Sequence, residues 1–250
     1  DVIHHPIAVQ EFRTPAYSVA LDDDVSHRGS IPLIVGESIE MTTSARYYAG
    51  GGLGGAPIDW LATVTTTRYE PPGWSSYGFE PPKKRSQRAY WRYQESGSTS
   101  ASQTGSLSGA STASMTWGLA ALPNRMPSVL SVDATVTDVD RMSIRASSRP
   151  ILVHPSAYYV GLRMKPKTVG VLQAIVTDID GNVVKGIPVE IAIEAVLGSE
   201  QFRDDAKLVD TTTCKLTSDA SPVDCAFKLD ITHAYVGTAK VADARGRQNV

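Results

Sequence analysis

The residue types that could carry catalytic chemistry are scattered along this chain rather than clustered. No Gly-x-Ser-x-Gly motif supplies a nucleophile that one of the five histidines could activate. A glycosidase would need two carboxylates facing each other across a cleft, whereas the acids here fall mostly in turn-like segments. We therefore predict no catalytic residue, no cofactor and no enzymatic activity. The histidines are His4, His5, His27, His154 and His233.

Two acidic runs, Asp22–Asp24 and Asp178–Asn182, carry the oxygen ligands that calcium prefers. The second run lacks the twelve-residue loop of an EF-hand, with Gly at its sixth position and Glu at its end. Asp-Gly sequences also form tight turns, because the Asp carboxylate accepts hydrogen bonds from the backbone that follows it. We interpret both runs as turns and predict no metal site.

The chain has two cysteines, Cys214 and Cys225, with ten residues between them in a strand-turn-strand context. This spacing suits a disulfide across a hairpin, which would require an oxidising compartment. The alternative is a pair of unrelated thiols in a cytosolic protein, because free cysteine is often buried. A zinc site has less support, because two sulfurs without a nearby pair of histidines leave the ion short of ligands.

Aromatic side chains offer the remaining candidate chemistry. Trp74 follows Pro-Pro-Gly and Trp91 lies among cations, so we predict both as weak candidates for a surface that binds sugar or peptide. Trp60 lies in an alternating segment and is predicted to be core. The five cations between Lys83 and Arg92 are interleaved with aromatic residues, as in some nucleic-acid-binding surfaces. In a chain of net charge -2 they favour a solvated hairpin, and we predict no nucleic-acid partner.

The segments that must position these residues have the pattern of β-strands. Successive side chains of a strand point to opposite faces, so alternation of apolar and polar residues indicates a strand buried on one face. No segment shows the i, i+3, i+4 apolar spacing of an amphipathic helix. The fold class is therefore predicted to be all-β, as a sandwich or barrel. Alternation is clearest in Ala16–Leu21, Ile58–Val64, Val129–Val136, Val169–Val176 and Pro188–Ile193.

Length and composition favour two domains of ordinary globular type. The chain has 250 residues, of which 42% are hydrophobic and 20% charged. No apolar run approaches the roughly 20 residues that span a bilayer, and the start has no signal-peptide pattern, so we expect a piece of a longer protein. Pro155 ends one strand-like run before another begins, which places a domain boundary there. Residues 96–114 are almost wholly Ser, Thr, Gly, Ala and Gln; we predict a long loop or weak edge segments, with a glycosylated or cleavable segment as the alternative.

Several short motifs follow one another along the chain in a recognisable order. They are Val9–Val19; Ala45–Gly52 with Ala56–Trp60; Pro71–Trp74 with Tyr77–Phe79; Leu152–Pro155 with Tyr158–Leu162 and Val176–Gly181; and Cys214 and Cys225 with Asp243–Asn249. In this order they resemble the macroglobulin domains of the bacterial α2-macroglobulins, a family related to complement C3. The order of the motifs, more than any single one, carries the resemblance. It covers most of the chain apart from the Ser-rich stretch and residues 200–207.

The resemblance implies two consecutive seven-stranded antiparallel β-sandwiches of the macroglobulin-like type, which is similar to fibronectin and Ig domains. The first would span residues 9–155 and carry the Ser-rich insertion at 96–114. The second would span residues 156–250, contain the disulfide, and need not be complete. Residues 1–8 would be the end of a preceding domain.

Proteins of that family trap endoproteases. Cleavage of an exposed bait segment lets a ring of macroglobulin domains rearrange around the protease, and a Cys-Gly-Glu-Gln thioester can link the two covalently. This chain has no Cys-x-x-Gln, and in the family the bait lies C-terminal to domains of this kind. The resemblance therefore implies a scaffold fragment of a broad-spectrum protease inhibitor, periplasmic or at the cell envelope or outside the cell. Its expected partners are endoproteases, through the full-length protein, and neighbouring macroglobulin-like domains. The alternative is an adhesin-like or carbohydrate-binding cell-surface protein that uses Trp74 and Trp91.

Overall fold

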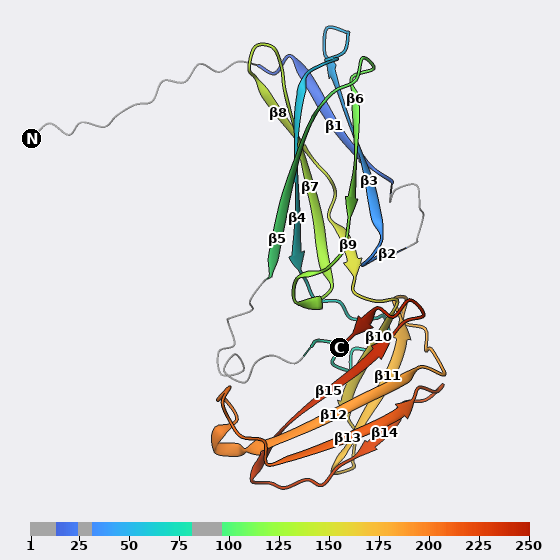
Figure 1. Cartoon of the computed structure of the whole chain (residues 1–250). Helices are drawn as coiled ribbons and strands as arrows, with labels where there is room; N and C mark the ends of the chain where they lie inside the picture. Colours follow the sequence, from blue (N-terminus) through green and yellow to red (C-terminus); the bar gives the residue numbers. More distant parts are fainter. Residues whose placement is uncertain (1–13, 25–31, 82–96) are drawn as a thin grey trace, which may run out of the picture.

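The computed structural model describes residues 14–24, 32–81 and 97–250, which form two β-sandwiches (Figure 1). Residues 155–157 connect the last strand of the first sandwich to the first strand of the second. Helical structure in these ranges is limited to short 3₁₀ turns such as η2 (Pro123–Arg125) and η3 (Gly198–Glu200). The prediction of an all-β fold is thus confirmed. The strands of the first sandwich are β1 (Tyr17–Asp23), β2 (Leu33–Ile34), β3 (Ser38–Tyr47), β4 (Pro57–Thr66), β5 (Ser98–Ser106), β6 (Thr112–Gly118), β7 (Ser128–Thr137), β8 (Ser143–Ser147) and β9 (Ile151–His154).

The first sandwich packs a three-stranded sheet, β1-β3-β6, against a larger sheet in the order β2-β9-β7-β4-β5. Its nine described strands exceed the seven expected, because the ten-residue β7 pairs along one side with two short strands and because the two-residue β2 adds to the edge of that sheet. The start of β7 pairs with β9 and its end with β8. The pairing is antiparallel except between β2 and β9, which run parallel.

The alternating segments bury one face, as the pattern predicts. Along β7 every second residue is buried, and β4 buries Ile58, Trp60, Ala62 and Val64. Trp60 is 3% exposed and its indole nitrogen donates a hydrogen bond to Thr43 Oγ1 at 2.9 Å, which confirms its place in the core. The hydroxyl partner removes the cost of burying the indole N–H.

The Ser-rich stretch forms strands rather than the long loop that we favoured. Ser98–Ser106 is strand β5, which pairs with β4 along its whole length, and Thr112–Gly118 is β6 at the edge of the opposite sheet. Backbone pairing needs no apolar side chain, so a segment without core residues still completes a sheet edge. The expectation of weak edge segments was the better of the two.

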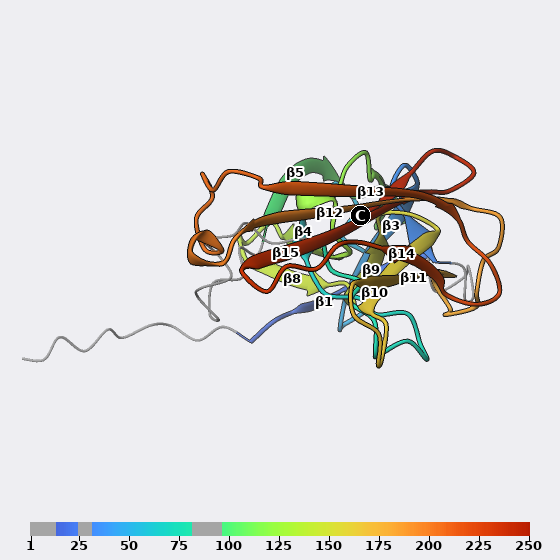
Figure 2. The ribbon, with the colours of Figure 1, turned by 90° about the horizontal axis from the view of Figure 1, so that it is seen from below.

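The second sandwich consists of a three-stranded sheet, β10-β11-β14, and a four-stranded sheet, β13-β12-β15-β16. Seen from below, β12, β13 and β15 form one layer and β10, β11 and β14 the other (Figure 2). The strands are β10 (Tyr158–Met164), β11 (Val171–Asp178), β12 (Pro188–Leu197), β13 (Asp210–Thr217), β14 (Val223–Ala226), β15 (His233–Ala242) and β16 (Gln248–Asn249). Its core gathers Val160, Leu172, Ala174, Val176, Val189, Ile191, Ile193, Cys225, Ala239 and Val241.

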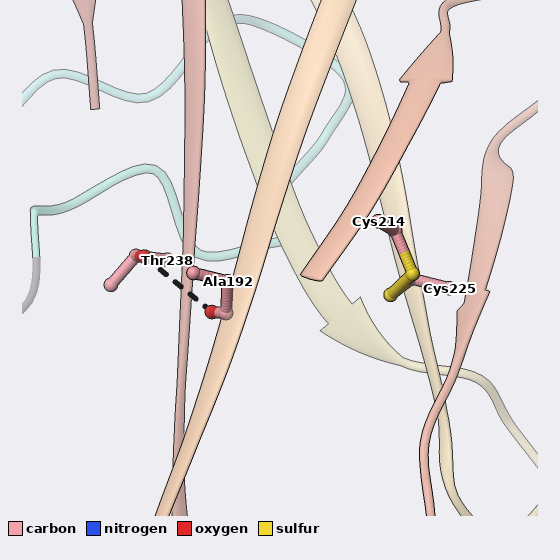
Figure 3. The surroundings of a disulfide bond; sticks show 4 residues. All are labelled: Ala192, Cys214, Cys225 and Thr238. Atoms are coloured by element: carbon pink, nitrogen blue, oxygen red, sulfur yellow. Dashed lines mark hydrogen bonds between the residues drawn. A yellow bond between two sulfur atoms is a disulfide. The ribbon is translucent and has the colours of Figure 1, made fainter. Parts of the chain in front are cut away.

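Cys214 and Cys225 form a disulfide with a Cα–Cα distance of 5.9 Å (Figure 3). The bond itself was predicted, but its setting across a hairpin was wrong. Cys214 lies on β13 and Cys225 on β14, which are edge strands of two different sheets. The disulfide therefore joins the two layers of the sandwich along one of its open sides.

Candidate functional site at the domain junction

The segment after β4, residues 67–81, fixes the orientation of the second sandwich relative to the first. We call it the clasp loop. It leaves the first sandwich and lies against β10 of the second (Figure 1). Gly78 N donates to Leu162 O at 2.8 Å, and Leu162 N donates to Gly78 O at 2.9 Å. The clasp loop thus forms a short antiparallel bridge with β10, a strand that pairs otherwise with β11.

An apolar cluster distinct from the two sandwich cores forms where the clasp loop meets the second domain. Tyr77 and Phe79 are 5% and 6% exposed, and they pack with Tyr159 and Ile175. This contact explains why β11 is buried on both faces. Its inner face serves the sandwich core, whereas its outer face lies under the clasp loop. The complete cluster is Ile34, Tyr77, Phe79, Tyr159, Ile175 and Ile179, with Tyr69, Trp74, Ala157 and Val183 packed against it.

Polar contacts fix the orientation of this cluster. Tyr69 Oη donates to Ile179 O at 2.5 Å, and Trp74 Nε1 donates to Gly181 O at 2.9 Å. The Arg163 guanidinium lies over the Tyr77 ring at 4.3 Å from its centroid, a cation–π contact, and donates to Ser76 Oγ at 3.1 Å. Directional bonds of this kind select one relative position of the two domains, which apolar packing alone does not.

Two glycines of the second domain leave the space that the clasp loop occupies. A Cβ at Gly181 would lie 2.2 Å from Pro72 O, and Gly181 also has a positive φ of +86°. A Cβ at Gly161 would lie 2.6 Å from the Phe79 ring and 2.9 Å from Tyr77 Cβ. Backbone and clasp loop approach each other closely only because both positions lack a side chain.

A second set of contacts holds the opposite side of the junction, in the turn between β15 and β16. Asp243 Oδ1 accepts from the backbone N–H groups of Arg245 and Arg247, and Oδ2 accepts from Ala157 N and from Arg247 Nε. Burial alone would raise the pKa of this carboxyl, but these hydrogen bonds hold the pKa below its ordinary value. Arg247 then reaches the first domain, where its Nη1 lies 3.3 Å from Val35 O and 3.7 Å from Glu37 Oε1.

His154 ends β9 at the centre of the junction and is 3% exposed. Its Nδ1 lies 2.8 Å from the hydroxyl of Tyr159, and the Tyr69 ring packs edge-on at 4.7 Å between centroids. Burial lowers the pKa of His154 to about 4, so the imidazole is neutral at pH 7, and burial raises the pKa of Tyr159. His154 thus lies at a strand end directly before the boundary predicted at Pro155, and its side-chain partner is a tyrosine hydroxyl.

Trp74, predicted on an exposed binding surface, is half-buried in the junction; a ligand-binding role for it stays a prediction. Several predictions concern residues outside the described ranges: Trp91, the cation-rich segment 83–92, residues 1–8, His4, His5 and His27.

Asp178 accepts from Asn182 N at 2.8 Å and from Asn182 Nδ2 at 3.0 Å, which is the turn chemistry that we expected. In the described ranges, no three His, Cys, Asp or Glu side chains gather as metal ligands, and no helix is long and apolar enough to cross a membrane.

Most motifs that carried the sequence resemblance meet at this junction. The Pro-Pro-Gly-Trp and Tyr-Gly-Phe motifs form the clasp loop, the motifs from Leu152 to Gly181 form the surface that receives it, and Asp243–Asn249 forms the opposite turn. Sequence reasoning missed Tyr69 and Arg163. The available signal was the concentration of aromatic and glycine residues in the clasp loop, beyond what a solvated loop requires.

Comparison with known proteins gives a likeness of fold. No family model and no curated protein matches this sequence. Among solved structures, the chain is similar to trypsin-activated α2-macroglobulin from Escherichia coli, at 10% identity and a TM-score of 0.55, with 95% of this chain and 16% of that chain covered. It is also similar to the native conformation of E. coli α2-macroglobulin, at 9% identity and a TM-score of 0.50, with 96% and 16% covered.

These superpositions extend over both sandwiches, while the chain spans only about one-sixth of the length of either relative. At such identities the likeness concerns the fold. The chain shares the fold of a segment of a bacterial α2-macroglobulin.

Proposed function

We propose that this chain is a scaffold segment of an α2-macroglobulin-like protease inhibitor, in which it holds two consecutive domains in fixed orientation. The observation that carries the proposal is that one superposition on activated E. coli α2-macroglobulin covers 95% of the chain, sandwiches and junction together. The junction supports it, because the clasp loop and the Arg247 contacts make the pair one mechanical unit.

The proposed setting is the periplasm, the cell envelope or the exterior. The Cys214–Cys225 disulfide supports an oxidising compartment, where such bonds persist. The proposed partners are endoproteases, met through the full-length protein, and the neighbouring domains of that protein. In this role the segment transmits a rearrangement triggered elsewhere and performs no bond-making itself.

The test uses the full-length protein mixed with trypsin. The remaining trypsin activity is measured on a small peptide substrate and on a large protein substrate. We expect activity on the small substrate to persist and activity on the large one to fall, because a trapped protease admits only small substrates. Equal cleavage of both substrates, with no change of shape by small-angle scattering, would refute the proposal.

The contribution of this segment is tested by Gly181→Ala in the full-length protein, with Gly186→Ala as the matched control. Both glycines have positive φ, +86° and +77°, but a Cβ at Gly186 meets nothing within 4 Å. We expect Gly181→Ala to weaken shielding of the large substrate and Gly186→Ala to leave it unchanged. Identical shielding by the two variants would mean that the junction plays no part in trapping.

A further inference from the structure

The outer edge of β5 is paired with no strand in the described ranges of the first sandwich. β5 ends the order of its sheet, and none of the described strands pairs with its outer side (Figure 1). All nine of its residues are exposed. An edge of this length is a ready template for another strand.

The hydrogen bonds at the two ends of the ladder show which residues face outward. Thr66 N donates to Gly97 O and Leu107 N donates to Ala56 O, both at 2.9 Å, and the register between them has no break. In an antiparallel pair the residues that exchange hydrogen bonds alternate. Odd-numbered residues of β5 therefore bond to β4, and even-numbered ones direct their N–H and C=O groups outward. These are Ser98, Ser100, Ser102, Thr104 and Ser106.

Several other edges of the molecule carry features that block strand addition, whereas β5 carries none; the shorter edge strand β6 also lacks charge and proline. The edge strand β13 includes Asp210 and Lys215, and the edge of β10 is occupied by Gly78 of the clasp loop. From Gly97 to Asn124, by contrast, the sequence contains no Asp, Glu, Lys or Arg, and β5 has neither proline nor bulge. Charge, proline and bulges are the usual protection of a sheet edge.

We propose that β5 pairs antiparallel with β5 of a second copy of this chain, across a two-fold axis at Ser102. In this register Ser98 faces Ser106 of the other copy, Ser100 faces Thr104, and Ser102 faces Ser102. Every facing residue belongs to the outward set, so the pairing forms about ten backbone hydrogen bonds. It also joins the larger sheets of the two copies into one.

The side chains of β5 match this occupant. Across a two-fold axis a strand meets its own sequence in reverse, so a charge close to Ser102 would lie near its own copy and repel it. Here each facing pair of outward residues is hydroxyl against hydroxyl, as Thr65 Oγ1 and Ser98 Oγ already are across β4 and β5 at 3.2 Å. A charged or strongly apolar partner would find no complement on this edge.

A cysteine at the axis tests the register. Facing residues that exchange hydrogen bonds lie about 5.5 Å apart between Cα atoms, within the range that a disulfide spans. Both native cysteines are already paired, so the new thiol is the only free one in the described residues. We expect Ser102→Cys to form a disulfide-linked dimer on mild oxidation and Thr104→Cys, whose counterpart lies four residues along the facing strand, to remain monomeric. No cross-link in the first variant, or equal cross-linking in both, would overturn the proposal.

Proline substitution tests the backbone contact. Ser102→Pro removes an outward N–H, whereas Ala101→Pro removes a bond to β4 and should destabilise the fold. We expect the wild-type chain to form a dimer in sedimentation equilibrium and Ser102→Pro to raise its Kd about tenfold or more at unchanged circular dichroism. A wild-type chain that stays monomeric at millimolar concentration overturns the proposal. So does protection of the Ser100 and Ser102 amides from hydrogen exchange in the monomer, because another segment of the chain would then occupy the edge.

Discussion

At the scale of single residues, His154 makes the junction sensitive to pH. The side chain is buried against Tyr159 and Tyr69, and in the folded protein its pKa is about 4, against 6.5 in the unfolded chain. Between these values the unfolded chain binds a proton that the folded protein does not. The stabilisation is therefore complete above pH 6.5 and is lost as the pH falls toward 4.

We expect the free energy of unfolding to fall by about 3 kcal/mol between pH 7 and pH 4 on account of this group. Urea denaturation at several pH values measures the slope. His154→Gln should flatten it, because glutamine does not titrate. A slope that survives in His154→Gln would assign the pH dependence to other groups.

Gly181 is the residue on which the fit of the clasp loop depends most directly. Gly181→Ala and Gly186→Ala both place a side chain at positive φ, which costs about 1 kcal/mol each. Only the former also forces a contact with Pro72 O, and overpacking of this kind costs about 1–3 kcal/mol more. We expect thermal unfolding to show this extra loss in Gly181→Ala. Equal losses in the two variants would mean that the clasp loop moves aside freely.

At the scale of the elements, the two open sides of the second sandwich are closed by different means. The disulfide joins β13 and β14 on one side, and the clasp loop covers the edge of β10 on the other. The sheets are thus restrained at both margins. The sequence showed that both cysteines lie near strands, but not that those strands belong to different sheets, because spacing does not specify topology.

Reduction of the disulfide should lower the free energy of unfolding by about 2–3 kcal/mol, the chain-entropy value for closing so short a loop. Urea denaturation with and without reductant measures the difference. A Cys214→Ser/Cys225→Ser double variant should be equally destabilised and indifferent to reductant. A reductant effect that persists in the double variant would exclude the disulfide as its cause.

The strands show how far sequence reasoning extends. Alternation located β4 and β7 within one or two residues, because one buried face leaves a period of two in the sequence. It could not locate β5, whose contribution is backbone pairing alone. It also could not identify the hydrogen-bond partner of Trp74, because nothing near Pro-Pro-Gly-Trp indicates Gly181, which lies more than one hundred residues later. Long-range contacts of this kind fixed the junction, and no local pattern encodes them.

At the scale of the whole molecule, the junction connects the two sandwiches through several independent contacts. Its aromatic cluster, the Tyr69 and Trp74 hydrogen bonds and the Arg247 contacts tie different elements of both domains together. We expect one cooperative transition in calorimetry for the intact chain, since each domain supports the other.

Trp74→Ala combined with Phe79→Ala should split that transition into two, because the cluster loses its main contacts from the clasp loop while each sandwich keeps its own core. Tyr48→Ala, at a position 69% exposed, is the control and should leave a single transition. Two transitions in the wild-type chain would contradict the expectation of a single rigid unit.

The clasp loop lies within the first domain in the sequence, yet it covers the edge strand β10 of the second domain. A gene fragment beginning at residue 156 would encode a protein with Tyr159 and Ile175 laid bare and with β10 open to aggregation. Recombination at that point would likewise deliver a damaged module. The smallest unit that should fold independently is therefore the pair of domains. Where such domains are recombined during evolution, we expect the two to be inherited together.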